Sequence, residues 1–476
     1  MINVDVAVIG AGTAGLAAYR AAKAADRRVV LIEGGPHGTT CARVGCMPSK
    51  LLIAAAEAAH LPHKWDELGL RGSVRVDGRA VMARIKRERD RFVDFVLASV
   101  DGIPQGDKLQ GYARFIDEHT LALHTGVRVR FGQAVIATGS SPSVPAILRG
   151  AGDRLVVNDD VFAWDDLPRS VAVFGPGVIG LELGQALHRL GVSVHMFGRG
   201  GPVGPFTDPA LREYAARTFH DDFYLDADAK IVAIERIAEG VRIQYREPSG
   251  EARTVVVDYL IAATGRTPNL SKLDLASTSL TLDARGVPVF DRTTLRCGSS
   301  HIFIAGDASD DLPLLHEAAD EGRIAGGNAA RFPRVEPSAR RVPLAIVFTD
   351  PQLAVIGTRY ADLDLRKTVI GTVSFEDQGR SRVMLRNRGL LHVYADADTG
   401  ALLGAEMIGP DAEHIAHLMA WALQCGLTIE RMLEMPFYHP VVEEALRTAL
   451  RDAKAKIDRA RAHLDLPRPR VDPLAA

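Results

Sequence analysis

The chain has 476 residues, of which 47% are hydrophobic and 24% charged, a balance typical of a globular protein with about three domains of ~150 residues. A formal net charge of −2 gives no electrostatic reason to expect nucleic acid or an anionic membrane as a partner. No apolar run reaches the ~18 residues of a membrane span, and no basic signal-peptide region opens the chain, so we expect a cytoplasmic protein.

The first 33 residues predict a strand, a helix and a second strand. The apolar strands cover 4–10 and 28–33, and the helix between them covers 11–25. Three glycines form G-x-G-x-x-G where the first strand meets the helix, and these are Gly10, Gly12 and Gly15. Glu33 closes the second strand. Such glycines let a pyrophosphate approach the backbone at a helix N-terminus, and the acid binds the ribose hydroxyls. The pattern therefore predicts a dinucleotide site. The alternative is a tight strand–helix turn that binds no ligand.

A Cys-x₄-Cys loop follows at Cys41 and Cys46. A structural zinc site needs four ligands, whereas Cys297 and Cys425 lie far apart in the sequence, so we expect no metal. A structural disulfide that closes so short a loop would add little stability to a chain that buries a large core. In the cytoplasm a close cysteine pair is more often catalytic or metal-binding than structural.

A long helix and a strand ending in a Thr-Gly turn come next. Segment 78–100 predicts a helix with a charged face, capped by Asp77. The strand within 131–145 ends in turn residues typical of a domain junction, and the same pattern recurs within 258–269. The turn residues are Thr138, Gly139 and, in the repeat, Gly265.

A second fingerprint lies within 170–200, with glycines at Gly175, Gly177 and Gly180. Two fingerprints imply two dinucleotides, and a flavin with a nicotinamide is the simplest redox pairing. The counterpart of Glu33 is Gly198, followed by Arg199. An arginine there receives a 2′-phosphate in NADP sites; the alternative is a solvated loop cation.

The sequence pattern changes in the last third of the chain. A strand within 301–315 ends at Asp307, whose carboxylate either faces the ligand crevice of the sheet or caps the next helix. From about 341 the pattern is α+β, with strands over 389–396 and 402–409, a helix over 441–464 and a tail, 465–476, predicted to be disordered.

Together these motifs resemble the flavoprotein pyridine nucleotide–disulfide oxidoreductases, and among them most closely the dihydrolipoamide dehydrogenase type. The matching stretches are the first fingerprint, CARVGCMPSK, IATGSSP, the second fingerprint, ATGRTPN, IFIAGD, VFTDPQLAVIG and FYHPVVEEA. The implied fold class is α/β, with two Rossmann-like dinucleotide-binding domains and a C-terminal α+β dimerisation domain. The implied boundaries are an FAD-binding domain over 1–147, an NAD(P)-binding domain over 148–270, a central domain completing the FAD site over 271–340, and an interface domain over 341–476.

The resemblance also assigns roles to individual residues. Cys46 is the flavin-facing sulfur and Cys41 the one that exchanges with a dithiol. Pro48 suits the first position of a following helix, whose positive end favours a thiolate at Cys46. Residues implied to bind FAD are Gly10, Gly12, Gly15, Glu33, Lys50, Ala113, Thr138, Gly139 and Asp307. Those implied to serve NAD(P) are Gly175, Gly177, Gly180, Glu182, Arg199 and Gly265, with Glu182 pairing with Lys50 beside the flavin.

A dithiol must lose protons before it attacks, which suits a histidine base. His439 occupies the family's C-terminal His-Pro motif, with Glu444 implied as its orienting partner and Glu443 as a rival four residues on. In the family this segment reaches the cysteines of the other subunit, so the resemblance implies a homodimer with composite sites.

The expected function is oxidation of dihydrolipoamide through Cys41–Cys46 and FAD with reduction of NAD or NADP. The dithiol is either a small molecule or a lipoyl domain, and a 2-oxoacid dehydrogenase-type complex is the implied partner. The alternatives are an NADPH-dependent glutathione-type disulfide reductase and a non-catalytic flavin-bound component of a lipoyl complex. The absence of a C-terminal cysteine pair argues against mercuric reductase.

Overall fold

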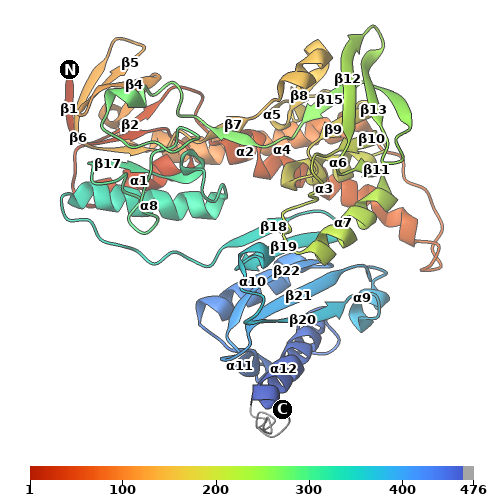
Figure 1. The fold of residues 1–476 in the computed structure, drawn as a ribbon. Helices are drawn as coiled ribbons and strands as arrows, with labels where there is room; N and C mark the ends of the chain where they lie inside the picture. Colours follow the sequence, from red (N-terminus) through yellow and green to blue (C-terminus); the bar gives the residue numbers. More distant parts are fainter. Residues whose placement is uncertain (465–476) are drawn as a thin grey trace, which may run out of the picture.

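The N-terminal strands form the centre of a seven-stranded sheet in the computed structural model, which describes residues 1–464 (Figure 1). In β1 (Ile2–Ile9), Val6 and Val8 pack on one face and Ala7 and Ile9 on the other, so the strand is buried on both sides, as its apolar run predicts. Strands β1, β2, β3 and β17 run parallel to their neighbours. The other strands are β2 (Val29–Glu33), β3 (Lys108–Gln110), β4 (Ala113–Asp117), β5 (Thr120–Leu123), β6 (Arg128–Ile136) and β17 (Ile302–Ile304).

Two helices cover one face of this sheet. Helix α1 (Thr13–Ala24) crosses α8 (Leu315–Arg331) at very short range, because a Cβ at Gly322 would lie 2.1 Å from the Ala14 carbonyl oxygen. Through β17 and α8 the chain beyond residue 271 therefore returns to the first sheet and packs beside the first fingerprint.

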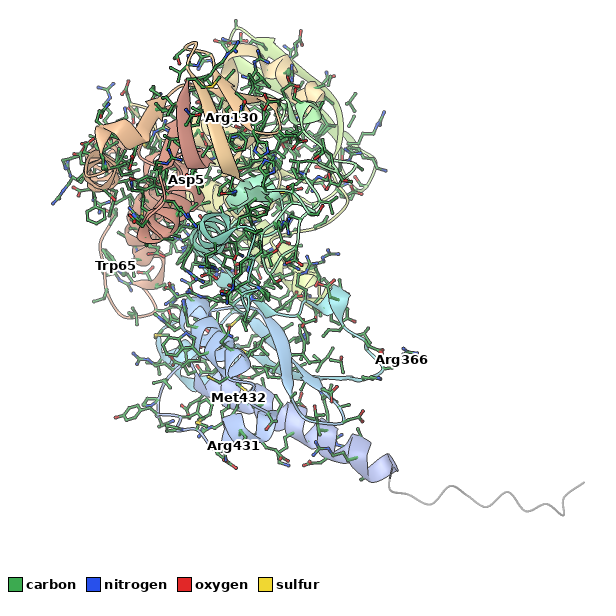
Figure 2. All side chains as sticks on the ribbon, turned by 90° about the vertical axis from the view of Figure 1, so that its left-hand side faces the viewer. Asp5, Trp65, Arg130, Arg366, Arg431 and Met432 are labelled. Carbon is green, nitrogen blue, oxygen red and sulfur yellow. The ribbon has the colours of Figure 1, made fainter. Side chains whose placement is uncertain are left out.

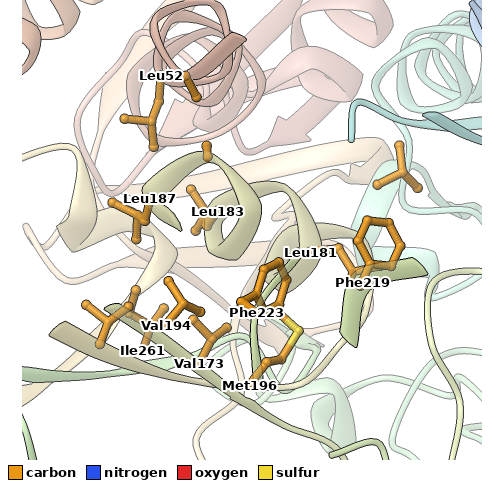
Figure 3. Close-up of a cluster of buried hydrophobic side chains, with 14 of the residues drawn as sticks. Leu52, Val173, Leu181, Leu183, Leu187, Val194, Met196, Phe219, Phe223 and Ile261 are labelled. Atoms are coloured by element: carbon orange, nitrogen blue, oxygen red, sulfur yellow. The ribbon is translucent and has the colours of Figure 1, made fainter. Parts of the chain in front are cut away.

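The second fingerprint lies in a separate five-stranded parallel sheet. Helix α6 (Val178–Arg189) covers it, and α3 (Cys46–His60) packs on the other side of α6, with Leu52 of α3 facing Leu183 and Leu187 of α6 (Figure 3). The parallel strands are β8 (Leu155–Val157), β9 (Ser170–Phe174), β10 (Ser193–Phe197), β11 (Tyr224–Asp226) and β15 (Tyr259–Ala262). An antiparallel sheet is added by β12 (Lys230–Ile237), β13 (Gly240–Arg246) and β14 (Ala252–Val257).

The two units are joined where the predicted Thr-Gly turns lie. Strand β7 (Ser140–Pro142) follows the first turn and pairs antiparallel with β16 (Arg266–Pro268), which follows the second. The repeat noted in the sequence therefore forms the two-stranded link between the sheets.

The C-terminal unit is an antiparallel five-stranded sheet with helices on it, placed below the other two units in Figure 2, where Met432 and Arg431 lie far from Asp5 and Arg130. Its strands are β18 (Leu344–Val347), β19 (Gln352–Gly357), β20 (Thr368–Ser374), β21 (Leu390–Asp396) and β22 (Leu402–Gly409). Its helices are α9 (Gly379–Val383), α10 (Ala412–Gln424), α11 (Ile429–Leu433) and α12 (Glu444–Leu464).

Most element predictions are confirmed. Helix α4 (Gly78–Asp101) occupies the predicted segment, and the Asp77 side chain accepts a hydrogen bond from the Ala80 N–H at 3.0 Å. Helix α12 starts at Glu444, three residues later than predicted, and the predicted disordered tail lies outside the described residues. The remaining helices are α2 (Thr40–Val44), α5 (Asn158–Val161) and α7 (Pro209–Asp222), and short 3₁₀ turns are η1 (Leu61–Lys64), η2 (Gln105–Asp107), η3 (Ala146–Arg154), η4 (Leu275–Ser277), η5 (Gly306–Ser309) and η6 (Tyr360–Asp362).

Candidate active site

The first fingerprint shapes an open cradle at the start of α1. Gly10 has φ +106°, and a Cβ there would lie 2.3 Å from the Ala137 carbonyl oxygen, so only glycine fits. Gly12 is the N-cap of α1, where no side chain accepts a capping hydrogen bond, and nothing stands within 4 Å of its hypothetical Cβ. The free N–H groups and positive end of α1 suit a pyrophosphate.

Glu33 closes this cradle on the side of β2. Its Oε2 accepts the Ala11 N–H at 2.7 Å and its Oε1 accepts the Gly35 N–H at 2.7 Å. Around it lies a cavity of about 490 Å³. Its lining contains the predicted residues Gly10, Gly12, Glu33, Ala113, Thr138 and Gly139. Gly15 lies deeper, where α1 meets β1, because a Cβ there would lie 1.8 Å from the Gly10 carbonyl oxygen.

A second cavity of about 540 Å³ adjoins the first and contains both loop cysteines. The walls shared by the two cavities are Gly12, Thr40, Val44, Ala137, Gly139, Ser140 and Arg266. The second cavity is also lined by Cys41, Cys46, Lys50, Glu182 and Asp307. Thr138 Oγ1 is buried without a hydrogen-bond partner. One long ligand with a ribose at Glu33, a pyrophosphate at Gly12 and a ring beside the sulfurs fits this shape, and FAD has these parts in this order.

The cysteines lie at the junction of two helices. Cys41 belongs to α2 and Cys46 begins α3, and both are free thiols. The expectation that Pro48 opens the helix is wrong: α3 starts two residues earlier, which places its positive end at Cys46 itself. Hydrogen bonding to Cys41, together with the charge of Lys50 and against the effect of burial, lowers the pKa of Cys46 from 9.0 to about 7. The same hydrogen bond and burial raise the pKa of Cys41.

Lys50 and Glu182 form an ion pair across the second cavity, with Nζ 2.6 Å from Oε2. The Glu182 side chain is only 6% exposed, and its Oε1 accepts the Phe348 N–H at 3.0 Å. The Lys50 ammonium also stands 4.5 Å from the centre of the Phe348 ring. Phe348 was missed at the sequence level, although it lies in the quoted VFTDPQLAVIG stretch, because no pattern there indicates a contact with α3.

Asp307 is held by a short chain of hydrogen bonds. The Ser140 hydroxyl donates to Asp307 Oδ2 at 2.6 Å, and Arg266 donates to the Ser140 hydroxyl and carbonyl, each at 2.7 Å. Ser140 and Arg266 come from the two strands that link the sheets. Their signal was available, since each follows directly after one of the two Thr-Gly turns.

His439 lies away from the cysteines of its own chain. Its side chain is 81% exposed and lines neither cavity. His439 Nδ1 lies 2.9 Å from Glu444 Oε2, while Glu443 lines a different cavity near Trp421. Although partial burial opposes it, the hydrogen bond with His439 keeps the pKa of Glu444 below its ordinary value.

The second fingerprint repeats the geometry of the first without its acid. Gly175 has φ +103° and lies against the Ala263 carbonyl oxygen, as Gly10 lies against that of Ala137. The Gly175 N–H bonds to the Phe197 carbonyl, so Gly198 occupies the position of Glu33. A Cβ at Gly198 would lie 2.4 Å from the Ala227 carbonyl oxygen, which excludes a carboxylate there.

The remaining predicted residues of this region fall around that turn. Gly177 is the N-cap of α6, Gly180 lies under Gly175, Gly265 sits in the second Thr-Gly turn with φ +106°, and Arg199 is exposed. Within residues 1–464 no three histidine, cysteine, aspartate or glutamate side chains gather as metal ligands, and no described helix has the length and apolar content needed to cross a bilayer.

Comparison with known proteins agrees with this geometry. The model of the pyridine nucleotide-disulphide oxidoreductase family matches residues 4–322, and that of its dimerisation domain matches 343–450. A mercuric reductase of Shigella flexneri is 31% identical over 93% of this chain and 80% of its own length. A dihydrolipoyl dehydrogenase of Haloferax volcanii is 30% identical over 94% of this chain and 96% of its own.

Two solved structures share the fold. The Cu(II) complex of the flavoprotein disulfide reductase RclA of Escherichia coli superposes with a TM-score of 0.80 at 23% identity, covering 95% of this chain and 99% of its own. LpdA of Mycobacterium tuberculosis gives a TM-score of 0.80 at 24% identity with the same coverage. The matched family binds FAD and a pyridine nucleotide, and the cradles described above suit both. The chain is a member of the pyridine nucleotide-disulphide oxidoreductase family, an FAD- and NAD(P)-dependent flavoprotein disulfide oxidoreductase with a C-terminal dimerisation domain.

Proposed function

We propose that this enzyme oxidises dihydrolipoamide to lipoamide through a Cys41–Cys46 disulfide and FAD, with reduction of NAD(P)⁺. The observation that carries the proposal is the place of Cys46, which begins α3 and lines the second cavity together with Cys41 and Lys50. Its pKa, lowered to about 7 by Cys41 and Lys50, supports a thiolate there. The similarity to the dihydrolipoyl dehydrogenase of Haloferax volcanii along 96% of that protein supports this thiol substrate. Glu33 and Asp307 would hold the cofactor's ribose and ribityl hydroxyls.

The residues of the second cavity would then have different roles in the reaction. Cys41 exchanges with the substrate sulfur, because it is the less acidic thiol and leaves Cys46 to carry the negative charge. Bound FAD supplies the two-electron carrier between Cys46 and the nicotinamide. Lys50, fixed by Glu182 at 2.6 Å, places one positive charge beside the ring position. A cation there stabilises negative charge in the cavity.

The base comes from a second copy of the chain. His439 is exposed and remote from the cysteines of its own chain, so a proton acceptor for the dithiol has to be supplied across an interface. Glu444 orients its ring at 2.9 Å. A homodimer built through the dimerisation domain meets this requirement and gives two composite sites. A cytoplasmic lipoyl-carrying complex of the 2-oxoacid dehydrogenase type is the partner we propose.

A second candidate, an NADPH-dependent disulfide reductase of the glutathione type, is favoured by one observation. The position that selects an unphosphorylated ribose is Gly198, which has no room for a side chain, and Arg199 follows it. Reduction of a mercuric ion is a weaker candidate function despite the similarity to the Shigella flexneri enzyme. The sequence lacks a C-terminal cysteine pair, since its last cysteine is Cys425, which stands alone.

Steady-state turnover separates these functions. Dihydrolipoamide with NAD⁺ or NADP⁺ is compared with glutathione disulfide plus NADPH, and turnover only in the second assay contradicts the first proposal. Cys41→Ser should abolish thiol turnover, whereas Cys425→Ser, which changes an exposed cysteine outside both cavities, should leave it intact. Dithionite titration tests the non-catalytic alternative: a redox-active pair with flavin takes about four electrons per subunit, and flavin alone takes about two.

A further inference from the structure

A row of polar side chains runs between α3 and α6, from the active-site cavity to the surface. Along α6 the row is Glu182, Gln185 and Arg189, which lie on one face of the helix. Along α3 it is Ser49 and, two turns later, Glu57. These five residues are here called the α3–α6 seam. They belong to the same two helices whose apolar contact, Leu52 with Leu183 and Leu187, is drawn in Figure 3.

Four of the five seam residues, Glu57, Glu182, Gln185 and Arg189, line a small cavity. Its volume of about 10 Å³ is close to the space that one water molecule requires. Glu182 separates this cavity from the one that contains the cysteines, because it lines both. The remaining walls are Ile53, Ala56, Glu57, Gln185, Ala186, Arg189, Phe348, Thr349 and Asp350.

A buried donor in this cavity lacks a partner. The Arg189 side chain is 4% exposed, and its Nη2 donates to the Asp350 carbonyl and carboxylate, each at 3.1 Å. Its Nε is buried and makes no hydrogen bond to any described residue. Gln185 cannot satisfy it, since the Gln185 amide already bonds to Asp350 at both ends and to Asp222. A water in the cavity would accept from Arg189 Nε and donate to carboxylate oxygens.

The outer end of the seam is the carboxyl group of Glu57. Glu57 is exposed to solvent on one side. Partial burial and the charge of Asp350 raise its pKa, against the opposing charges of Arg189 and Arg386. Glu413, from α10, adds to the upward shift. A carboxyl that reaches solvent on one side and a cavity on the other can pass a proton between them, and a raised pKa favours that role.

Proton balance calls for such a route. Oxidation of a dithiol by NAD(P)⁺ gives a disulfide, NAD(P)H and one proton. The electron pair enters the second cavity through Cys46, while His439 of the partner subunit takes up the thiol protons outside that cavity. The hydride that leaves on the nicotinamide consists of a proton and the electron pair. One proton per turnover therefore has to reach the second cavity by another path.

We propose that the α3–α6 seam holds an ordered water and supplies this proton, passing it from solvent through Glu57 and the water to the Lys50–Glu182 pair. Arg189 is a positioning residue that orients the water through Nε. In the reverse direction NAD(P)H delivers a hydride, its electron pair opens the Cys41–Cys46 bond, and its proton leaves along the seam. The inference rests on the flavin–disulfide chemistry of the proposed function and is independent of the identity of the thiol substrate.

The test is reduction of the holoenzyme by NAD(P)H in a single turnover, followed by absorbance in H₂O and D₂O. Glu57→Gln removes the proton carrier and should slow the proton-dependent phase by about 10²-fold, within the range that positioned acid–base groups contribute. Its solvent isotope effect should rise, and a small weak acid in the buffer should restore the rate. Glu57→Asp should retain most of it. The matched control is Glu67→Gln, an exposed acid in the following loop, which should behave as the parent.

A crystal structure of the parent holoenzyme gives a readout that does not depend on activity. It should show a water within hydrogen-bond distance of Arg189 Nε and of a Glu182 or Glu57 oxygen, and Glu57→Gln should retain this water. An empty cavity overturns the inference, and so does an unchanged rate and isotope effect in Glu57→Gln. Because the assay uses no dithiol, failure of dihydrolipoamide as a substrate would count only against the proposed function.

Discussion

The hydrogen bond between the two cysteines can be tested through the acidity of Cys46. With a pKa of about 7 instead of 9.0, about half of the Cys46 thiol is ionised at pH 7 rather than about 1%. The bond to Cys41 makes the largest contribution to this shift, and Lys50 adds to it. Cys41→Ala removes the donor and leaves Lys50, so the midpoint should move to about 8, with about fivefold less thiolate at pH 7.

The assay is the pH dependence of iodoacetamide alkylation of the reduced protein, with the modified peptide identified by mass spectrometry. A Cys425→Ser background removes the other exposed thiol. Cys41→Ser is the matched control, because a hydroxyl still donates a hydrogen bond and should keep the midpoint close to that of the parent. A midpoint in Cys41→Ala equal to that of the parent would refute the argument that Cys41 stabilises the thiolate.

Three further outcomes are expected. Lys50→Met leaves the buried Glu182 carboxylate without its cation and should lower the free energy of unfolding in urea by about 3 kcal/mol. Adding Glu182→Gln should recover most of this loss, and full stability of the single variant contradicts a stabilising role for the ion pair. Arg199→Ala should lower kcat/KM for NADP⁺ about tenfold and leave that for NAD⁺ unchanged, whereas equal effects on both would identify a solvated cation. Gly10→Ala places a methyl group 2.3 Å from the Ala137 carbonyl oxygen and should yield folded protein without flavin absorbance; a flavin content equal to the parent's argues against the cradle.

Local sequence patterns were sufficient for the parts of the fold that repeat. The fingerprints at Gly10 and Gly175 and the strands that precede them follow from β-branched runs and glycine spacing, which depend on residues close together in the chain. The helix start at Cys46 was misplaced because Pro48 is tolerated anywhere in the first turn, not only at its first position.

Contacts between distant segments were harder to predict. Phe348 meets Glu182 across the boundary of the C-terminal unit, and Arg266 meets Asp307 through Ser140, and neither pair has a spacing rule. His439 is exposed and lines neither cavity, so its proposed approach to the cysteines of a second copy stays a prediction. In both pairs tertiary packing decides the contact, and the motif indicates only that a residue of that type is present.

The close approach of the Ala227 carbonyl to Gly198 limits how this enzyme could be redesigned. Exchanging Gly198 for an acid, the usual single change for altering coenzyme choice, would push the added side chain into the backbone of the neighbouring strand's end. An engineer would have to rebuild the 226–229 turn at the same time. A side chain can therefore be introduced at Gly198 only if two chain segments change together.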